Sequence, residues 1–146
     1  YAARYPSSSQ FQDYHQYNGT KDFSAYLTVP ACLQFFEENN WEEGKASSRK
    51  LLQHYYPIVS NELESAPICP VSDEFLGQIC SIPIQTTDPV KLKDYLFDQH
   101  NIEIPITRRD DDCFLRISFQ PYNGEKEIEH LINALRSAKQ ETNLIN

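Results

Sequence analysis

The spacing of apolar residues changes repeatedly along residues 40–139, and this constrains the fold more than any other feature. Residues 113–119 alternate as a strand does, whereas residues 125–139 repeat apolar side chains at the spacing of one helical face. The expected elements are, in order, a helix over 22–39, a helix over 40–64, a strand over 75–84, a helix beginning at 87–89, a strand over 102–106, a strand over 113–119 and a helix over 125–139. This order predicts an α/β (α+β) fold, with a small, mostly antiparallel sheet of about three strands packed with helices.

Local signals refine these boundaries. Pro30 is expected to kink the first helix or to open a second one, with Thr28 as its N-cap. Asn40 followed by Glu43 predicts a capping-box-like start to the next helix. Apolar residues on both sides of the strand over 75–84 predict that both of its faces are covered. Residues 1–18 have no period and predict an extended lead-in, and residues 108–112 predict a charged loop.

Length and charge exclude several classes of protein. The 146 residues suffice for one ordinary domain, and the net charge of -8 argues against nucleic acid and anionic membranes as partners. No apolar run reaches the roughly 18 residues of a membrane-spanning helix. The sequence contains no methionine and begins at Tyr1 without a signal peptide, so we expect a fragment of a longer protein.

The four cysteines carry little functional signal. No pair of them has the C-x-x-C spacing of a zinc or redox motif. We expect reduced structural thiols in a cytoplasmic protein and no metal site. An even count of cysteines leaves open a secreted binding domain with two disulfides.

Arg116 is the most informative residue, because it lies in the middle of an apolar strand. A guanidinium there is costly to bury without an anion, and its planar fork suits a carboxylate or a phosphate. A structural ion pair, or an edge strand with that face in water, explains the residue equally well. In the latter readings Arg116 has no functional role.

Gly19 and Thr20 form the second candidate site. They are expected to precede a helix directly, where backbone N–H groups and a hydroxyl suit a phosphate. An ordinary helix N-cap is the alternative explanation. The three aspartates of residues 110–112 lack the spacing of a metal-binding loop.

Two segments together resemble the class V aminotransferases, in particular their isopenicillin N epimerase-like branch. The first is Asn18–Ala31 (NGTKDFSAYLTVPA), which is similar to a pattern G-T-R-D-x-S-A-x-L-x-V-P-A. The second is Phe114–Asn123 (FLRISFQPYN), which is similar to the family's R-[IV]-S signature followed by Y-N. The resemblance extends from about Phe11 to Lys139.

This resemblance implies the C-terminal part of a fold type I enzyme that uses pyridoxal 5'-phosphate. Residues 1–40 would be a lead-in and the end of the large domain, and residues 41–146 the C-terminal small domain. Arg116 would bind the α-carboxylate of an amino-acid substrate, and Gly19 and Thr20 would contact the cofactor phosphate. The Schiff-base lysine would lie in a missing N-terminal large domain, so this chain holds no catalytic residue and should be inactive alone. The full-length enzyme would act at Cα as a homodimer.

Other readings remain open at this stage. A stand-alone α/β interaction or regulatory domain would tie up Arg116 with an internal carboxylate such as Glu103. Within the family, a cysteine desulfurase or C–S lyase is the alternative outcome. A desulfurase needs a cysteine on a mobile loop, and the segment ahead of Arg116 offers only Cys113, already on the strand.

Overall fold

The computed structural model describes residues 9–15, 19–20 and 22–145 of the chain, which divides into two compact units, Tyr1–Asn39 and Asn40–Asn146. The expectation of an extended segment over residues 1–8 and 16–18 lies outside the described residues. Among the described residues, no helix is both long and apolar enough to cross a lipid bilayer.

The first unit consists of three short helices, α1 (Gln10–His15), α2 (Ser24–Leu27) and α3 (Val29–Glu38). Helix α1 corrects the expectation that the whole lead-in is extended. Pro30 lies in the first turn of α3 and so opens a second helix, as expected. Thr28 occupies the N-cap position, but its hydroxyl donates to the Ala25 carbonyl at 2.7 Å and caps nothing.

The second unit begins with the long helix α4 (Trp41–Glu62), which continues through Pro57. The expected capping box at its start is absent. Asn40 has a left-handed backbone (φ 49°), and its side chain makes no capping hydrogen bond. Its carbonyl instead accepts from the N–H groups of Glu43 and Gly44.

Three strands form one antiparallel sheet in the order β1-β3-β2: β1 (Ile79–Pro83), β2 (Ile106–Arg109) and β3 (Asp112–Ser118). The small antiparallel sheet packed with helices confirms the predicted fold class. Two boundaries were wrong. Ile102 and Ile104 precede β2 and are not paired, and Arg108 and Arg109 belong to β2, where we expected a loop.

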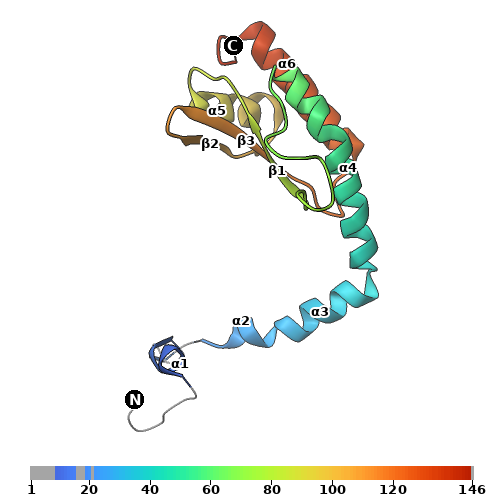
Figure 1. The fold of residues 1–146 in the computed structure, drawn as a ribbon, viewed down its shortest axis with the longest axis vertical. Coiled ribbons are helices and arrows are strands. Elements are labelled where there is room, and N and C mark those ends of the chain that lie inside the picture. Colours follow the sequence, from blue (N-terminus) through green and yellow to red (C-terminus); the bar gives the residue numbers. More distant parts are fainter. Residues whose placement is uncertain (1–8, 16–18, 21, 146) are drawn as a thin grey trace. The chain divides into compact units, whose positions relative to one another are not determined.

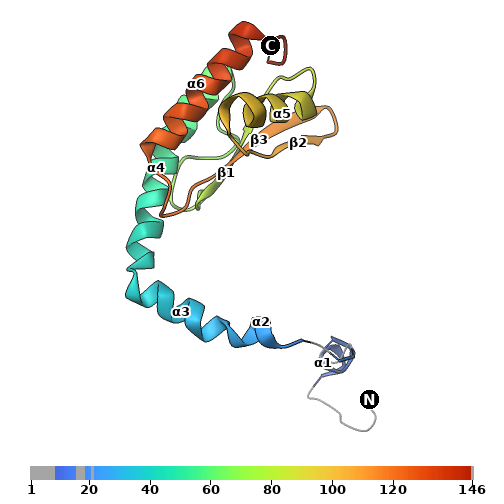
Figure 2. The same ribbon diagram turned by 180° about the vertical axis from the view of Figure 1, so that it is seen from behind.

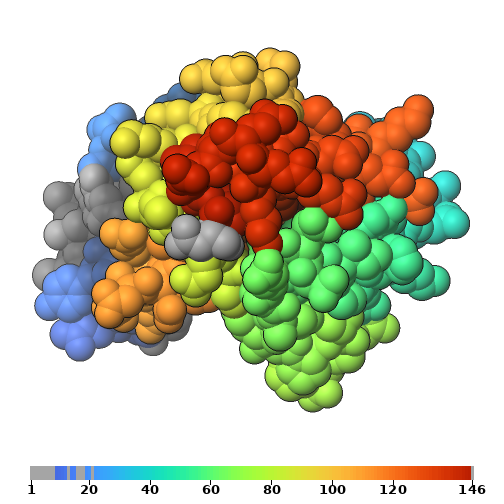
Figure 3. Space-filling view, turned by 90° about the horizontal axis from the view of Figure 1, so that it is seen from above, coloured from blue at the N-terminus to red at the C-terminus, as the bar shows by residue number. Residues whose placement is uncertain are grey.

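Helices α4, α5 (Pro89–His100) and α6 (Glu125–Glu141) pack with this sheet (Figures 1 and 2). Alternate residues of β1 and β3 are buried in one core, among them Cys80, Ile82, Leu115 and Ile117. Helix α6 lies against α4, as the space-filling view also shows (Figure 3). The outer face of β1 is not covered as expected, because Phe75 and Ile79 are exposed.

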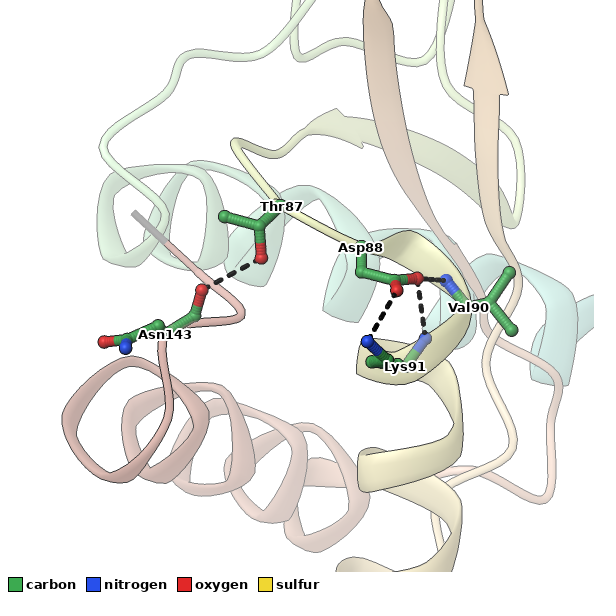
Figure 4. A network of polar contacts seen from close by, with 5 residues as sticks. All are labelled: Thr87, Asp88, Val90, Lys91 and Asn143. Atoms are coloured by element: carbon green, nitrogen blue, oxygen red, sulfur yellow. Dashed lines mark hydrogen bonds and ion pairs between the residues drawn. The ribbon is translucent and has the colours of Figure 1, made fainter.

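The start of α5 is fixed by two groups of contacts (Figure 4). The Asp88 carboxylate accepts from the N–H groups of Val90 and Lys91, both at 3.1 Å, as a proline-led helix start predicts. Thr87 donates through its hydroxyl to the Asn143 carbonyl at 2.9 Å. The last described residues of the chain therefore hold the segment that leads into α5.

Candidate functional site

Arg116 lies on β3, on the side of the sheet opposite the buried core. Its neighbours Leu115 and Ile117 are buried, whereas Arg116 and Ser118 are exposed. The Arg116 N–H donates to the Pro105 carbonyl at 3.0 Å, which fixes the backbone. Its guanidinium takes part in none of the ion pairs among the described residues, so the alternative of an ion pair with Glu103 has no counterpart here.

Beside Arg116 is a cleft of about 210 Å³ between the segment 102–105, the end of β3 and the first turns of α6. The apolar part of its lining comes from Ile102, Ile104, Ile117, Phe119, Ile128 and Leu131. Its polar part comes from Glu103, Arg116, Ser118, Asn123 and Glu127. Arg116 carries the positive charge of this lining, and its side chain has no carboxylate partner in the described chain.

The turn from β3 into α6 is held by its own side chains. The Asn123 side-chain carbonyl accepts from the Gln120 N–H, and the Glu127 carboxylate accepts from the Gly124 N–H, both at 2.9 Å. The Gly124 N–H lowers the pKa of the Glu127 carboxyl. Glu127 therefore stays ionised and directed at its own helix start.

Close packing holds the same turn against α4. A Cβ atom at Gly44 would come within 2.9 Å of Pro121. Glycine at position 44 thus allows α4 to approach the turn that borders the cleft.

Gly19 and Thr20 belong to the first unit and are exposed. Gly19 has a left-handed backbone (φ 96°) with no atom within 4 Å of a Cβ position, so its main chain is open to a ligand. The expected helix start directly after Thr20 is wrong, because α2 begins at Ser24. The Asp22 carboxylate accepts from the Ser24 N–H at 2.9 Å, which lowers the pKa of Asp22.

The remaining chemistry-bearing residues form no second site in the described part of the chain. All four cysteines are free, with Cys32 exposed, Cys69 half-buried, and Cys80 and Cys113 buried. Burial raises the pKa of Cys80 to about 12, which makes it a poor nucleophile. No group of three or more metal-ligating side chains occurs among the described residues.

Sequence reasoning missed Ser118 as a residue of the cleft. Its position two residues after Arg116 places both on the same side of β3, which was already visible in the alternation. What could not be foreseen is that β2 ends before it reaches Ser118. That boundary depends on Pro105.

The fold matches part of a solved enzyme structure. No model of a protein family matches the chain. The crystal structure of 8-amino-7-oxononanoate synthase from Francisella tularensis superimposes with a TM-score of 0.52 and 20% identity, over 76% of this chain and 32% of that one. That enzyme is a fold type I pyridoxal-phosphate enzyme, so the fold of this chain is found within that class.

Curated relatives narrow the class. Isopenicillin N epimerase of Amycolatopsis lactamdurans is 28% identical over 119 residues, 81% of this chain and 30% of that protein. A probable chloroplastic L-cysteine desulfhydrase of Arabidopsis thaliana is 30% identical over 134 residues, 80% of this chain and 28% of that protein. These relatives are class V aminotransferase-like, which confirms the resemblance recognised in the sequence. The chain spans just under a third of the length of each.

Proposed function

We propose that this chain belongs to a pyridoxal-phosphate-dependent, class V aminotransferase-like enzyme that acts on an amino acid at Cα. The observation that carries the proposal is Arg116, exposed at the edge of a cleft and without a carboxylate partner in the described chain. Relationship to isopenicillin N epimerase favours an epimerase-like outcome. The rest of the enzyme would supply the lysine that binds the cofactor, and we expect a homodimer.

Arg116 would bind the substrate's α-carboxylate. A guanidinium presents two parallel N–H donors to a carboxylate, which fixes the direction of the group as well as its position. The backbone of Arg116 is held in the sheet, so the orientation of the bound amino acid would be set from a rigid base. This positioning decides which bond at Cα is presented for reaction.

Gly19 and Thr20 would contact the phosphate of the cofactor. The open main chain at Gly19 and the exposed Thr20 fit an anion, since N–H and hydroxyl groups are phosphate donors. Asp22 already occupies the N-terminus of α2, so this role is supported by the resemblance and not by the helix. Pyridoxal phosphate, when bound, supplies an electron sink for the bond broken at Cα.

Replacing Arg116 tests the carboxylate role. In the full-length enzyme, Arg116→Lys should raise KM for the amino-acid substrate by about tenfold or more, because the paired donors are lost. Steady-state kinetics would measure KM, and the visible spectrum would show that the cofactor is retained. Arg109→Lys, an exposed arginine outside the cleft lining, is the matched control. An unchanged KM for Arg116→Lys would remove the proposal.

Thr20→Ala tests the phosphate contact. Loss of one hydroxyl donor should weaken cofactor retention, by roughly a fewfold to tenfold in affinity. Retention would be followed by absorbance during dialysis of the full-length enzyme. Thr107→Ala, an exposed threonine on β2, is the control. Equal retention in both variants would exclude Thr20 from the phosphate site.

A second candidate is cysteine C–S lysis, because the plant relative is named a cysteine desulfhydrase. The two outcomes differ in what leaves Cα. Sulfide release from L-cysteine would favour lysis, whereas solvent deuterium uptake at Cα with inversion would favour epimerisation.

A further inference from the structure

Beyond Arg116 the sheet loses one of its hydrogen-bonded partners. Strand β2 pairs with β3 in a register that sets Ile106 opposite Leu115. The same register would set Pro105 opposite Arg116 and Glu103 opposite Ser118. The Arg116 N–H does bond to the Pro105 carbonyl, but no hydrogen bond joins Glu103 and Ser118. Pro105 has no N–H to return, so the ladder ends there.

The Ser118 N–H therefore points into this opening. Residues of a central antiparallel strand direct their N–H groups alternately to the two neighbouring strands. The Phe119 N–H donates to the Gln78 carbonyl at 2.8 Å on the β1 side, and the Arg116 N–H donates on the β2 side. The Ser118 N–H must then face the β2 side, where no described residue accepts it.

This unpaired donor lies in the cleft that holds Arg116. Ser118 is exposed and lines the cleft, two residues along the same strand face from Arg116. The two carboxylates of the lining do not occupy it. Glu127 accepts from Gly124, and Glu103 is exposed and borders a neighbouring hollow with Lys93.

We propose that Ser118 is a positioning residue for the amino-acid substrate, whose carboxylate accepts the Ser118 N–H together with the Arg116 guanidinium. The inference rests on the proposed carboxylate role of Arg116. A carboxylate has acceptor sites for several donors. A main-chain N–H held by the sheet is a rigid donor, whereas the arginine head is carried on a flexible stem. The pair would fix the carboxylate better than either donor alone.

Ser118→Pro removes this N–H, and Ser118→Ala removes only the hydroxyl. Since the N–H makes no ladder bond, proline should be tolerated there as at a sheet edge. In the full-length enzyme loaded with cofactor, binding of L-alanine and of ethylamine would be followed by the cofactor absorbance. We expect Ser118→Pro to weaken L-alanine binding by about tenfold, with ethylamine unaffected because it has no carboxylate. Ser118→Ala should bind both compounds as the unaltered enzyme does.

Two results would overturn the inference: unchanged L-alanine binding in Ser118→Pro, or equal loss for both compounds. If Ser118→Pro does not fold, an ester bond in place of the 117–118 amide removes the same N–H with little change of shape. The same two compounds then decide the matter. Arg116→Gln separates the two proposals, because unchanged L-alanine binding in that variant would remove the carboxylate role itself. A loss in Arg116→Gln without a loss at Ser118 would remove only the inference.

Discussion

The two units of this chain contain similar secondary structure but differ in what supports it. Every residue from 22 to 39 is exposed, including large apolar side chains of α2 and α3 such as Leu27, Leu33 and Phe35. In the unit that begins at Asn40, apolar residues from three helices and the sheet share one buried core. Helix formation in the first unit is therefore not supported by burial within the described chain.

The difference shows that apolar content alone does not make a core. Helices shorter than about 12 to 15 residues are marginal in water without tertiary packing. Helix α3 has 10 residues and α2 has 4, so both need a surface to lie on. An exposed apolar region of this kind is typical of a surface that another part of a protein covers.

Dissection of the chain should produce the largest contrast. We expect residues 40–146 to unfold cooperatively on their own, because their core is internal. A peptide of residues 1–39 should show little helix. Far-UV circular dichroism with thermal and urea unfolding would measure both. A stably helical 1–39 peptide, or a non-cooperative 40–146 chain, would break the comparison.

Matched leucine truncations should sharpen the contrast within the intact chain. Leu115→Ala should lower the free energy of unfolding by about 2–5 kcal/mol, because this side chain is fully buried at 0% exposure. Leu33→Ala, at 56% exposure, should change it by about 0.5 kcal/mol or less. Urea unfolding would compare the two. Similar losses would mean that α3 contributes to the cooperative unit.

Helix caps should give the smallest contrast, and one that depends on pH. The Lys91 N–H lowers the pKa of Asp88 in the folded chain below its unfolded value of about 3.9. The resulting stability is present above the unfolded pKa and is lost as the pH falls through the folded pKa. Asp88→Ala should lower the unfolding midpoint at neutral pH, by less than Leu115→Ala does, and this difference should shrink in acid.

Two further variants control for this effect. Asp88→Asn retains an accepting oxygen for the cap but cannot titrate, so its difference from the unaltered chain should depend on pH without loss of the helix. Asp22→Ala removes an equivalent carboxylate from α2 and should leave the main unfolding transition unchanged. A shift of that transition in Asp22→Ala would contradict the separation of the two units.

Much of the element order could be predicted from apolar spacing, and the failures have physical reasons. Ile102 and Ile104 alternate as a strand does, and Ile104 is buried, but burial here comes without pairing because Pro105 ends the ladder. Arg108 and Arg109 looked like a loop, yet they pair with Cys113 and Asp112. Asp110, with φ 54°, turns the chain tightly enough for this.

The candidate site was predictable only in part. The position of Arg116 in a strand follows from alternation, and the structure places it beside a cleft. Its role and those of Gly19 and Thr20 stay predictions, because no ligand-bound geometry tests them. The unpaired Ser118 N–H depends on where two segments diverge in space, which no spacing of residues along the chain could show.

Pro105 has a consequence for solubility as well as for the cleft. An unpaired strand edge is a template on which another chain can add a strand and begin to aggregate. Here the ladder on the β2 side stops at Pro105, and β3 itself ends at Ser118, so the open stretch is too short for an intruding strand to align. The charged Glu103 on the facing segment adds a further barrier, since burying its carboxylate in a new sheet would be costly. One proline thus leaves a donor accessible to a small molecule while denying the same edge to a second polypeptide.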